Sequence, residues 1–139
     1  MSFSEVQELH RQLRLRLCAF AGPGALGEIN VTIPIADDDE ISFLRLVVWS
    51  YALLQEAGRV SFRFLKELPP FPSSERLVPE ASYLRTWATH NLSLEKDSDQ
   101  KKLKLAWAWL KKACGVSRPV KPEEWRACFS LLCDIVAST

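Results

Sequence analysis

The residues best suited to acid–base chemistry in this 139-residue chain are its only two histidines, His10 and His90. Imidazole is the side chain that gains and loses a proton near neutral pH. His90 follows Arg85 after four intervening residues, near the end of an expected helix. Since a guanidinium binds phosphate oxygens through parallel hydrogen bonds, this pair combines a proton carrier with a fixed cation. His10 lies on an amphipathic helix close to Glu8 and Arg11, and we expect it at the surface.

Most other signatures of enzymes are absent from the sequence. There is no glycine-rich phosphate loop, no GxSxG motif and no HExxH motif. The cysteines do not form close pairs with histidines, as a zinc site requires, so we expect buried free thiols in a reducing compartment. These cysteines are Cys18, Cys114, Cys128 and Cys133. The acidic run 37–40 is interpreted as the cap of a helix rather than a metal site. No metal and no cofactor are therefore expected.

The spacing of Arg85 and His90 has the form of the R-x4-6-H motif, and it resembles the HEPN superfamily. The resemblance implies a small all-α bundle, usually dimeric, that cleaves RNA without a metal ion in toxin–antitoxin, CRISPR and other antiviral systems. It also implies that Arg85 polarises the phosphate while His90 acts as general base or acid, giving a 2′,3′-cyclic phosphate and a 5′-hydroxyl. Thr86 occupies a place where the family more often has Asn, Asp or His. Asn91, which follows His90, is a further candidate.

One copy of the motif does not clamp a single phosphate easily. Residues five apart on a helix point about 140° apart and are separated by about 7.5 Å along the axis. In the HEPN family the motifs of two protomers meet across the dimer interface, so the resemblance implies a homodimer that binds RNA at a composite site. Apolar residues wrap almost completely around the segment 41–54, so this helix is expected either to be the central member of the bundle or to bury a second face in a partner protomer. In the second case it offers a hydrophobic surface for such a dimer.

A non-catalytic interpretation of the same residues stays open. The charge of His90 would then only stabilise the C-terminal end of its helix, and Arg85 would be an ordinary surface residue. The chain would be a helical interaction module, such as a small subunit of a nucleoprotein or defence complex or an inactive HEPN relative. A bundle that binds a small molecule is the third alternative, supported only by the aromatic content.

The positive charges of the chain are local rather than global. A net charge of +1 provides no overall attraction for a nucleic acid. Lysines gather on one face of the expected helix 98–114, and two arginines share the outer face of the first helix. These residues, which we predict to contact RNA or a docking partner, are Lys101, Lys104, Lys111, Lys112, Arg11 and Arg14. A partner such as an antitoxin or another subunit of a defence complex is also expected.

The apolar patterns predict one all-α domain over residues 1–139, a compact bundle of about five helices. Helices are expected from Ser4 to before Gly22 and over 39–57, 61–68, 80–91, 98–114 and 122–136, with an irregular or extended segment near 28–35. Trp49, Trp107 and Trp125 fall on apolar stripes and are expected in the core, whereas Trp87 and Trp109 are expected to be partly exposed. No stretch approaches the about 20 apolar residues of a membrane helix, and the chain does not start like a signal peptide. We therefore expect a cytoplasmic protein.

Overall fold

The computed structural model describes residues 1–57, 79–89 and 97–138. Five α-helices and one π-helical turn make up most of this part of the chain. They are α1 (Phe3–Ala21), α2 (Glu40–Tyr51), η1 (Ala52–Ala57), α4 (Pro79–Thr89), α5 (Asp97–Cys114) and α6 (Pro122–Ala137). The described residues contain no strand, and residues 28–35 are irregular. The predicted all-α fold is therefore confirmed, while the helix predicted over 61–68 lies outside the described residues.

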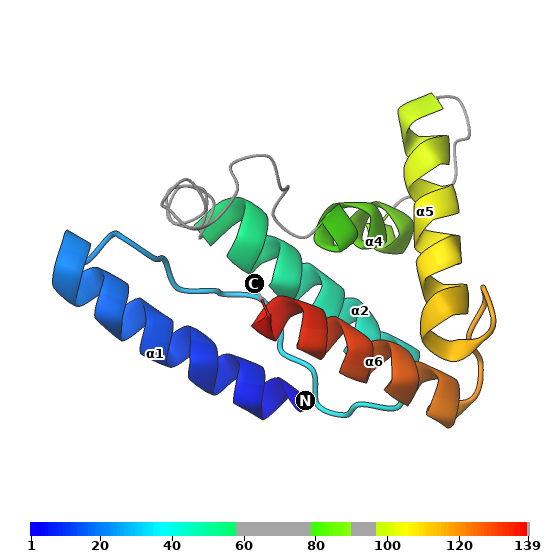
Figure 1. The fold of residues 1–139 in the computed structure, drawn as a ribbon, viewed down its shortest axis with the longest axis horizontal. Coiled ribbons are helices and arrows are strands. Elements are labelled where there is room, and N and C mark those ends of the chain that lie inside the picture. The colour runs from blue at the N-terminus through cyan, green and yellow to red at the C-terminus, as the bar shows by residue number, and fades with distance from the viewer. Residues whose placement is uncertain (58–78, 90–96, 139) are drawn as a thin grey trace.

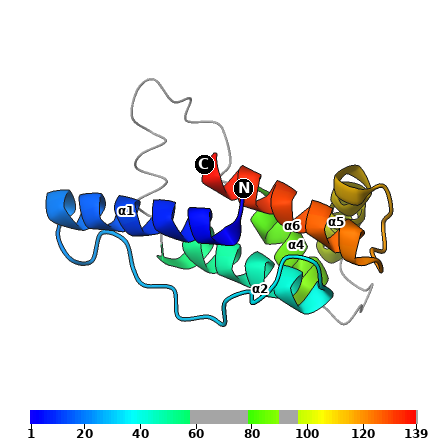
Figure 2. The same cartoon turned by 90° about the horizontal axis from the view of Figure 1, so that it is seen from below.

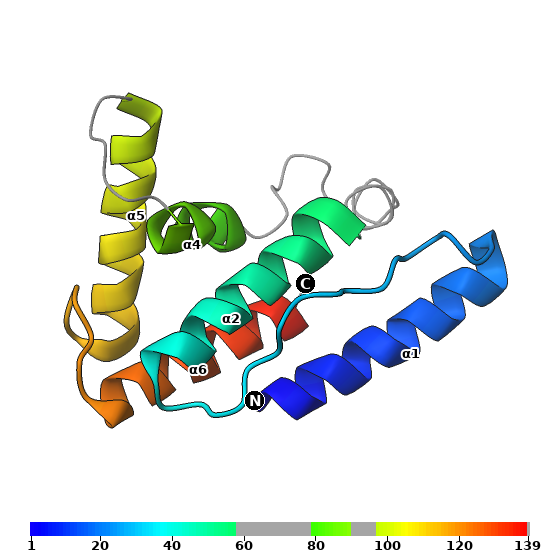
Figure 3. The same ribbon diagram turned by 180° about the vertical axis from the view of Figure 1, so that it is seen from behind.

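The helices form a bundle in which α1, α2 and α6 run side by side and α5 crosses them at one end (Figure 1). Helix α6 packs against α1, α2 and α5, and α4 fills the space between α2 and α5. Figure 2 shows α1 lying along the same direction as α2 and α6, and Figure 3 shows α5 crossing these helices at the opposite end of the molecule from the C-terminal end of α1. Within the described residues, no helix is long and apolar enough to cross a membrane.

The first helix begins two residues earlier than its sequence suggested. Ser2, not Ser4, is the N-cap, because its hydroxyl oxygen accepts from the backbone N–H of Glu5. The Glu5 carboxylate in turn accepts from the backbone N–H of Ser2 at 2.7 Å, which completes a capping box. The helix ends at Gly22, whose φ of 100° lies in the region that favours glycine.

Helix α2 is the central member of the bundle. Asp39 caps it by accepting from the backbone N–H of Ser42 at 2.7 Å, as the acidic run predicted. Helices α4 and α6 pack on α2, and Phe3 and His10 of α1 contact its Trp49. Most of its apolar surface is therefore buried within its own chain, so the dimer surface that we expected from residues 41–54 is largely covered.

Four aromatic rings form the centre of the core. Phe43 is fully buried, and its ring centroid lies 6.1 Å from that of Trp87, 6.0 Å from Trp109 and 5.6 Å from Trp125. The predictions for the two tryptophans of α5 were wrong, because Trp109 is buried and Trp107 is only half-buried. Because α5 packs against α4 and α6, it buries the stripe of Leu103, Ala106 and Leu110, and Trp109 lies within this core while Trp107 lies at its edge.

Candidate functional site

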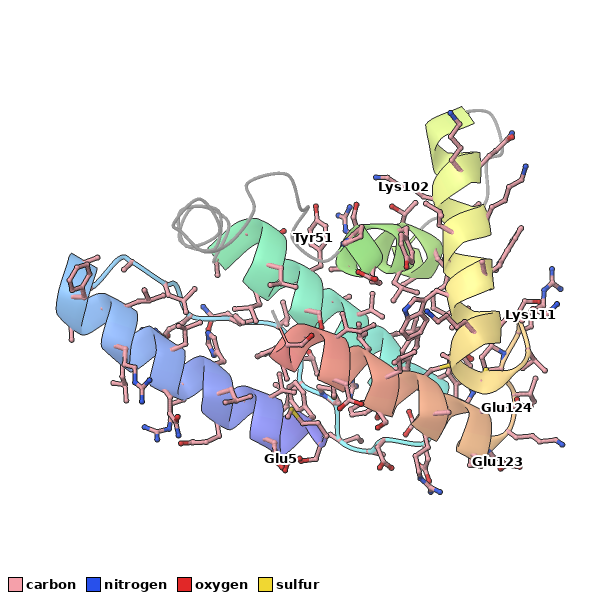
Figure 4. The ribbon with its side chains drawn as sticks, viewed as in Figure 1. Glu5, Tyr51, Lys102, Lys111, Glu123 and Glu124 are labelled. Atoms are coloured by element: carbon pink, nitrogen blue, oxygen red, sulfur yellow. The ribbon has the colours of Figure 1, made fainter. Side chains whose placement is uncertain are left out.

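Arg85 projects from α4 at the surface of the bundle and lies over an aromatic ring. Its guanidinium carbon is 4.6 Å from the centroid of the Tyr51 ring, a cation–π contact. Tyr51 is the last residue of α2 and lies beside α4 (Figure 4). The contact therefore ties the exposed guanidinium to the end of the central helix and limits the orientations that it adopts.

The residues around Arg85 in the motif have different environments. The Thr86 side chain is only 4% exposed, and its hydroxyl donates to the backbone oxygen of Ser82 at 3.1 Å. This bond to the preceding turn satisfies the hydroxyl within its own helix. Helix α4 ends at Thr89, and His90 and Asn91, the other two candidates from the sequence, lie outside the described residues.

The predicted lysine face of α5 is present. Lys101, Lys104, Lys111 and Lys112 are all exposed, and Lys102 is half-buried. Lys102 and Lys111 project from different parts of the helix in Figure 4. Helix α5 contains five lysines and only two aspartates, and it packs directly on α4, which carries Arg85. The positive charge of α5 is therefore close to the helix that carries the motif.

Arg11 and Arg14 of α1 do not join this lysine face. Arg11 forms two hydrogen bonds with the Glu8 carboxylate, at 2.8 and 2.6 Å. Arg14 forms an ion pair with Glu28 at 3.1 Å and donates to the backbone oxygen of Leu26. Both arginines border the same surface pocket, but Arg14 is half-buried against the segment after α1 whereas Arg11 is exposed. Acidic neighbours already balance both charges, and α1 and α5 lie apart (Figure 1).

His10 is not the surface residue that we expected. Its ring lies edge-on to Trp49, with the centroids 5.7 Å apart. Its Nε2 atom is buried and has no hydrogen-bond partner among the described residues. Burial, together with the charge of Arg14, lowers the pKa of His10 from its ordinary value. The neutral imidazole therefore acts as a packing group between α1 and α2.

The cysteines are free thiols, as predicted, but only two of them are buried. Cys128 and Cys133 lie in the core, whereas Cys18 and Cys114 are half-buried. Burial raises the pKa of the Cys133 thiol to about 12, and it raises the pKa of Cys128 as well. In the part of the chain that the structure describes, no group of three or more His, Cys, Asp or Glu side chains could hold a metal ion.

Sequence reasoning missed Tyr51 as a neighbour of Arg85. The two residues are 34 positions apart in the sequence, and no periodic pattern links them. Only the packing of α4 on the C-terminal part of α2 brings them together. An apolar helix that ends in a tyrosine was a weak signal, because such a residue often lies at the edge of a core with its hydroxyl in solvent.

Comparisons with known proteins identify no relative. No family model matches the chain, and no curated protein or solved structure is significantly similar to it.

Proposed function

We propose that the protein is a metal-independent endoribonuclease of the HEPN type, acting as a toxin or an antiviral defence effector in the cytoplasm. The observation that carries the proposal is the placement of Arg85 on the exposed side of α4, over Tyr51, in a helix that ends one residue before His90. An exposed guanidinium can bind an RNA phosphate, and the residue that follows Thr89 in the sequence is one of the two histidines of the chain.

In this mechanism Arg85 binds the phosphate and balances the negative charge that develops on its oxygens. His90 accepts the proton of the 2′-hydroxyl or donates a proton to the leaving 5′-oxygen. The bond from the 2′-oxygen to phosphorus forms as the bond to the 5′-oxygen breaks, so a 2′,3′-cyclic phosphate and a 5′-hydroxyl result. Tyr51 is a positioning residue that restricts the guanidinium through the cation–π contact.

Helix α5 supports RNA binding through its charge. Its exposed lysines lie on a helix that packs against α4, so positive charge is concentrated on one part of a chain that is nearly neutral as a whole. Lys101, Lys104, Lys111 and Lys112 would contact phosphates on either side of the cleaved linkage. The dependence of RNA affinity on salt would measure how many of these contacts form.

The proposal includes a homodimer with one motif from each protomer. Because α2 is largely covered within its own chain, the dimer needs a surface other than residues 41–54. The molar mass in solution, measured by light scattering under the conditions of RNA cleavage, tests this part. A mass of two chains is expected, and a strict monomer with full activity would refute the composite site.

One observation favours the alternative, a non-catalytic interaction module that acts as a small subunit of a defence or nucleoprotein complex. The side chain after Arg85 contributes a polar group in many HEPN proteins, yet the Thr86 hydroxyl is buried and bonded within α4. In that case Arg85 and the α5 lysines would contact a protein partner or an RNA without cleaving it.

Cleavage of labelled RNA in the presence of a chelator separates the two functions. We expect Arg85→Ala and His90→Ala to lower the cleavage rate at least about a hundredfold, within the range that positioned acid–base groups contribute. Arg16→Ala is a matched control, because Arg16 is an exposed arginine on α1, away from α4, and we expect it to retain full activity. Undiminished cleavage by both motif variants would reject the roles of Arg85 and His90.

A further inference from the structure

A pocket lined by three tryptophans opens where α2, α4, α5 and α6 meet. Its volume is about 370 Å³, within the range of small-molecule sites. Trp87, Trp107 and Trp125 line it together with two charged residues, Glu40 and Arg118. We call this site the tryptophan pocket. Four separate helices and the connection between α5 and α6 contribute to it, so it forms only in the folded chain.

The walls of the tryptophan pocket are held by the aromatic core. Trp125 is only 5% exposed, and its ring packs on that of the fully buried Phe43. The Trp87 ring contacts the same phenylalanine, while Trp107 is half-buried at the pocket rim. The rings of Trp87 and Trp125 are therefore fixed before a ligand arrives. Fixed aromatic faces favour a flat, aromatic ligand, because stacking on them costs little ordering.

The pocket has two charged side chains, those of Glu40 and Arg118. Within the described residues, neither Glu40 nor Arg118 forms an ion pair or a side-chain hydrogen bond, and both are exposed. A carboxylate only accepts hydrogen bonds, so Glu40 suits a ligand edge with neighbouring N–H donors. Guanine presents two such donors, at N1 and at the exocyclic amine, whereas adenine, cytosine and uracil present a donor next to an acceptor. Arg118 suits an attached phosphate.

Two lysines of α5 lie on the helix face that borders the tryptophan pocket. Lys104 precedes Trp107 by three residues and Lys111 follows it by four, so both lysines share the face of α5 that carries this indole. Both are exposed. This charge attracts the phosphates of a nucleotide, and it disfavours a quaternary ammonium ligand, which aromatic cages otherwise bind.

We infer that the tryptophan pocket binds the guanine base of a nucleotide, with the base against Trp87 and Trp107, Glu40 on its N–H edge and Arg118 on its phosphate. The inference goes beyond the proposed function and does not depend on it, because binding is measured without cleavage. Free guanosine monophosphate and a guanosine within an RNA strand share this chemistry, and the experiment distinguishes the two sources.

The test follows tryptophan fluorescence of the full chain, excited at the red edge of indole absorption, during titration with each of the four nucleoside monophosphates. We expect saturable quenching by guanosine monophosphate, with an affinity at least about fivefold above that for adenosine monophosphate. Glu40→Gln should remove most of this preference, and Arg118→Ala should weaken the binding of all four nucleotides. Glu123→Gln and Arg16→Ala, which change exposed residues outside the pocket, are the matched controls.

A second titration tests whether the pocket prefers a free nucleotide or a guanosine within RNA. It uses a short RNA of uridines that contains one guanosine and carries 2′-O-methyl groups to prevent cleavage. Tighter binding of this strand than of the free nucleotide assigns the pocket to RNA, and equal affinity assigns it to a mononucleotide. Equal quenching by all four nucleotides, no saturation, or unchanged guanine preference in a folded Glu40→Gln variant would overturn the inference. Saturable quenching by choline alone would also overturn it.

Discussion

The contact between Arg85 and Tyr51 is expected to contribute measurable free energy of unfolding. Replacing Tyr51 by leucine removes the ring face that lies 4.6 Å from the guanidinium carbon but keeps an apolar side chain at the end of α2. Because Arg85 is exposed, water screens much of the attraction, and we expect the value of an exposed cation–π pair, about 0.5–1 kcal/mol. This range corresponds to a factor of about two to five in an equilibrium constant.

A double-mutant cycle isolates this term. The free energies of unfolding in urea are measured for the wild type, Tyr51→Leu, Arg85→Leu and the double variant. Their combination gives the coupling energy, because the packing that each single change removes cancels in the cycle. Tyr51→Phe is the matched control, because it retains the ring and should retain the coupling. The reasoning would be refuted by a coupling energy of zero, or by a Tyr51→Phe variant that loses as much coupling as Tyr51→Leu.

Three further predictions concern the cap of α2, His10 and Thr86. Asp39→Ala should lower the free energy of unfolding by about 1 kcal/mol, because it removes the N-cap, and a urea midpoint equal to that of the wild type would contradict this. Burial lowers the pKa of His10, so below about pH 6.5 the unfolded chain takes up a proton that the folded chain resists, and stability falls. Between pH 7.5 and pH 5.5, the free energy of unfolding measured with urea should fall less for His10→Gln than for the wild type. Thr86→Val should leave RNA cleavage within about twofold, because the hydroxyl is buried within α4; a large loss would give Thr86 a direct role.

Local sequence patterns predicted the helices that bury a single apolar stripe and the residues at which helices begin and end. Helix α6 was expected over 122–136, and its apolar residues at i, i+3 and i+4 spacing, from Trp125 to Val136, are buried. The acidic run before α2 acts as its cap, and Gly115 ends α5 with a φ of 89°. These features depend on residues within one or two turns of each other, which is the range over which sequence periodicity carries information.

Features that depend on distant residues were not predictable. Helix α5 has tryptophans on two faces, and only its position between α4 and α6 decides that Trp109 is buried while Trp107 lines a pocket. His10 belongs to a helix with charged neighbours, yet Trp49, 39 residues away, covers its ring. The same holds for Arg85, whose aromatic partner belongs to another helix. In each case tertiary packing, not local propensity, determined the environment.

Analysis of the RNA ends tests the central claim most directly. Purified protein is incubated with a labelled RNA in chelator, and the products are identified by mass spectrometry and by their response to phosphatase and kinase. The account predicts 2′,3′-cyclic phosphate and 5′-hydroxyl ends that disappear in both Arg85→Ala and His90→Ala. Intact RNA with the wild type, or 5′-phosphate ends, would contradict it.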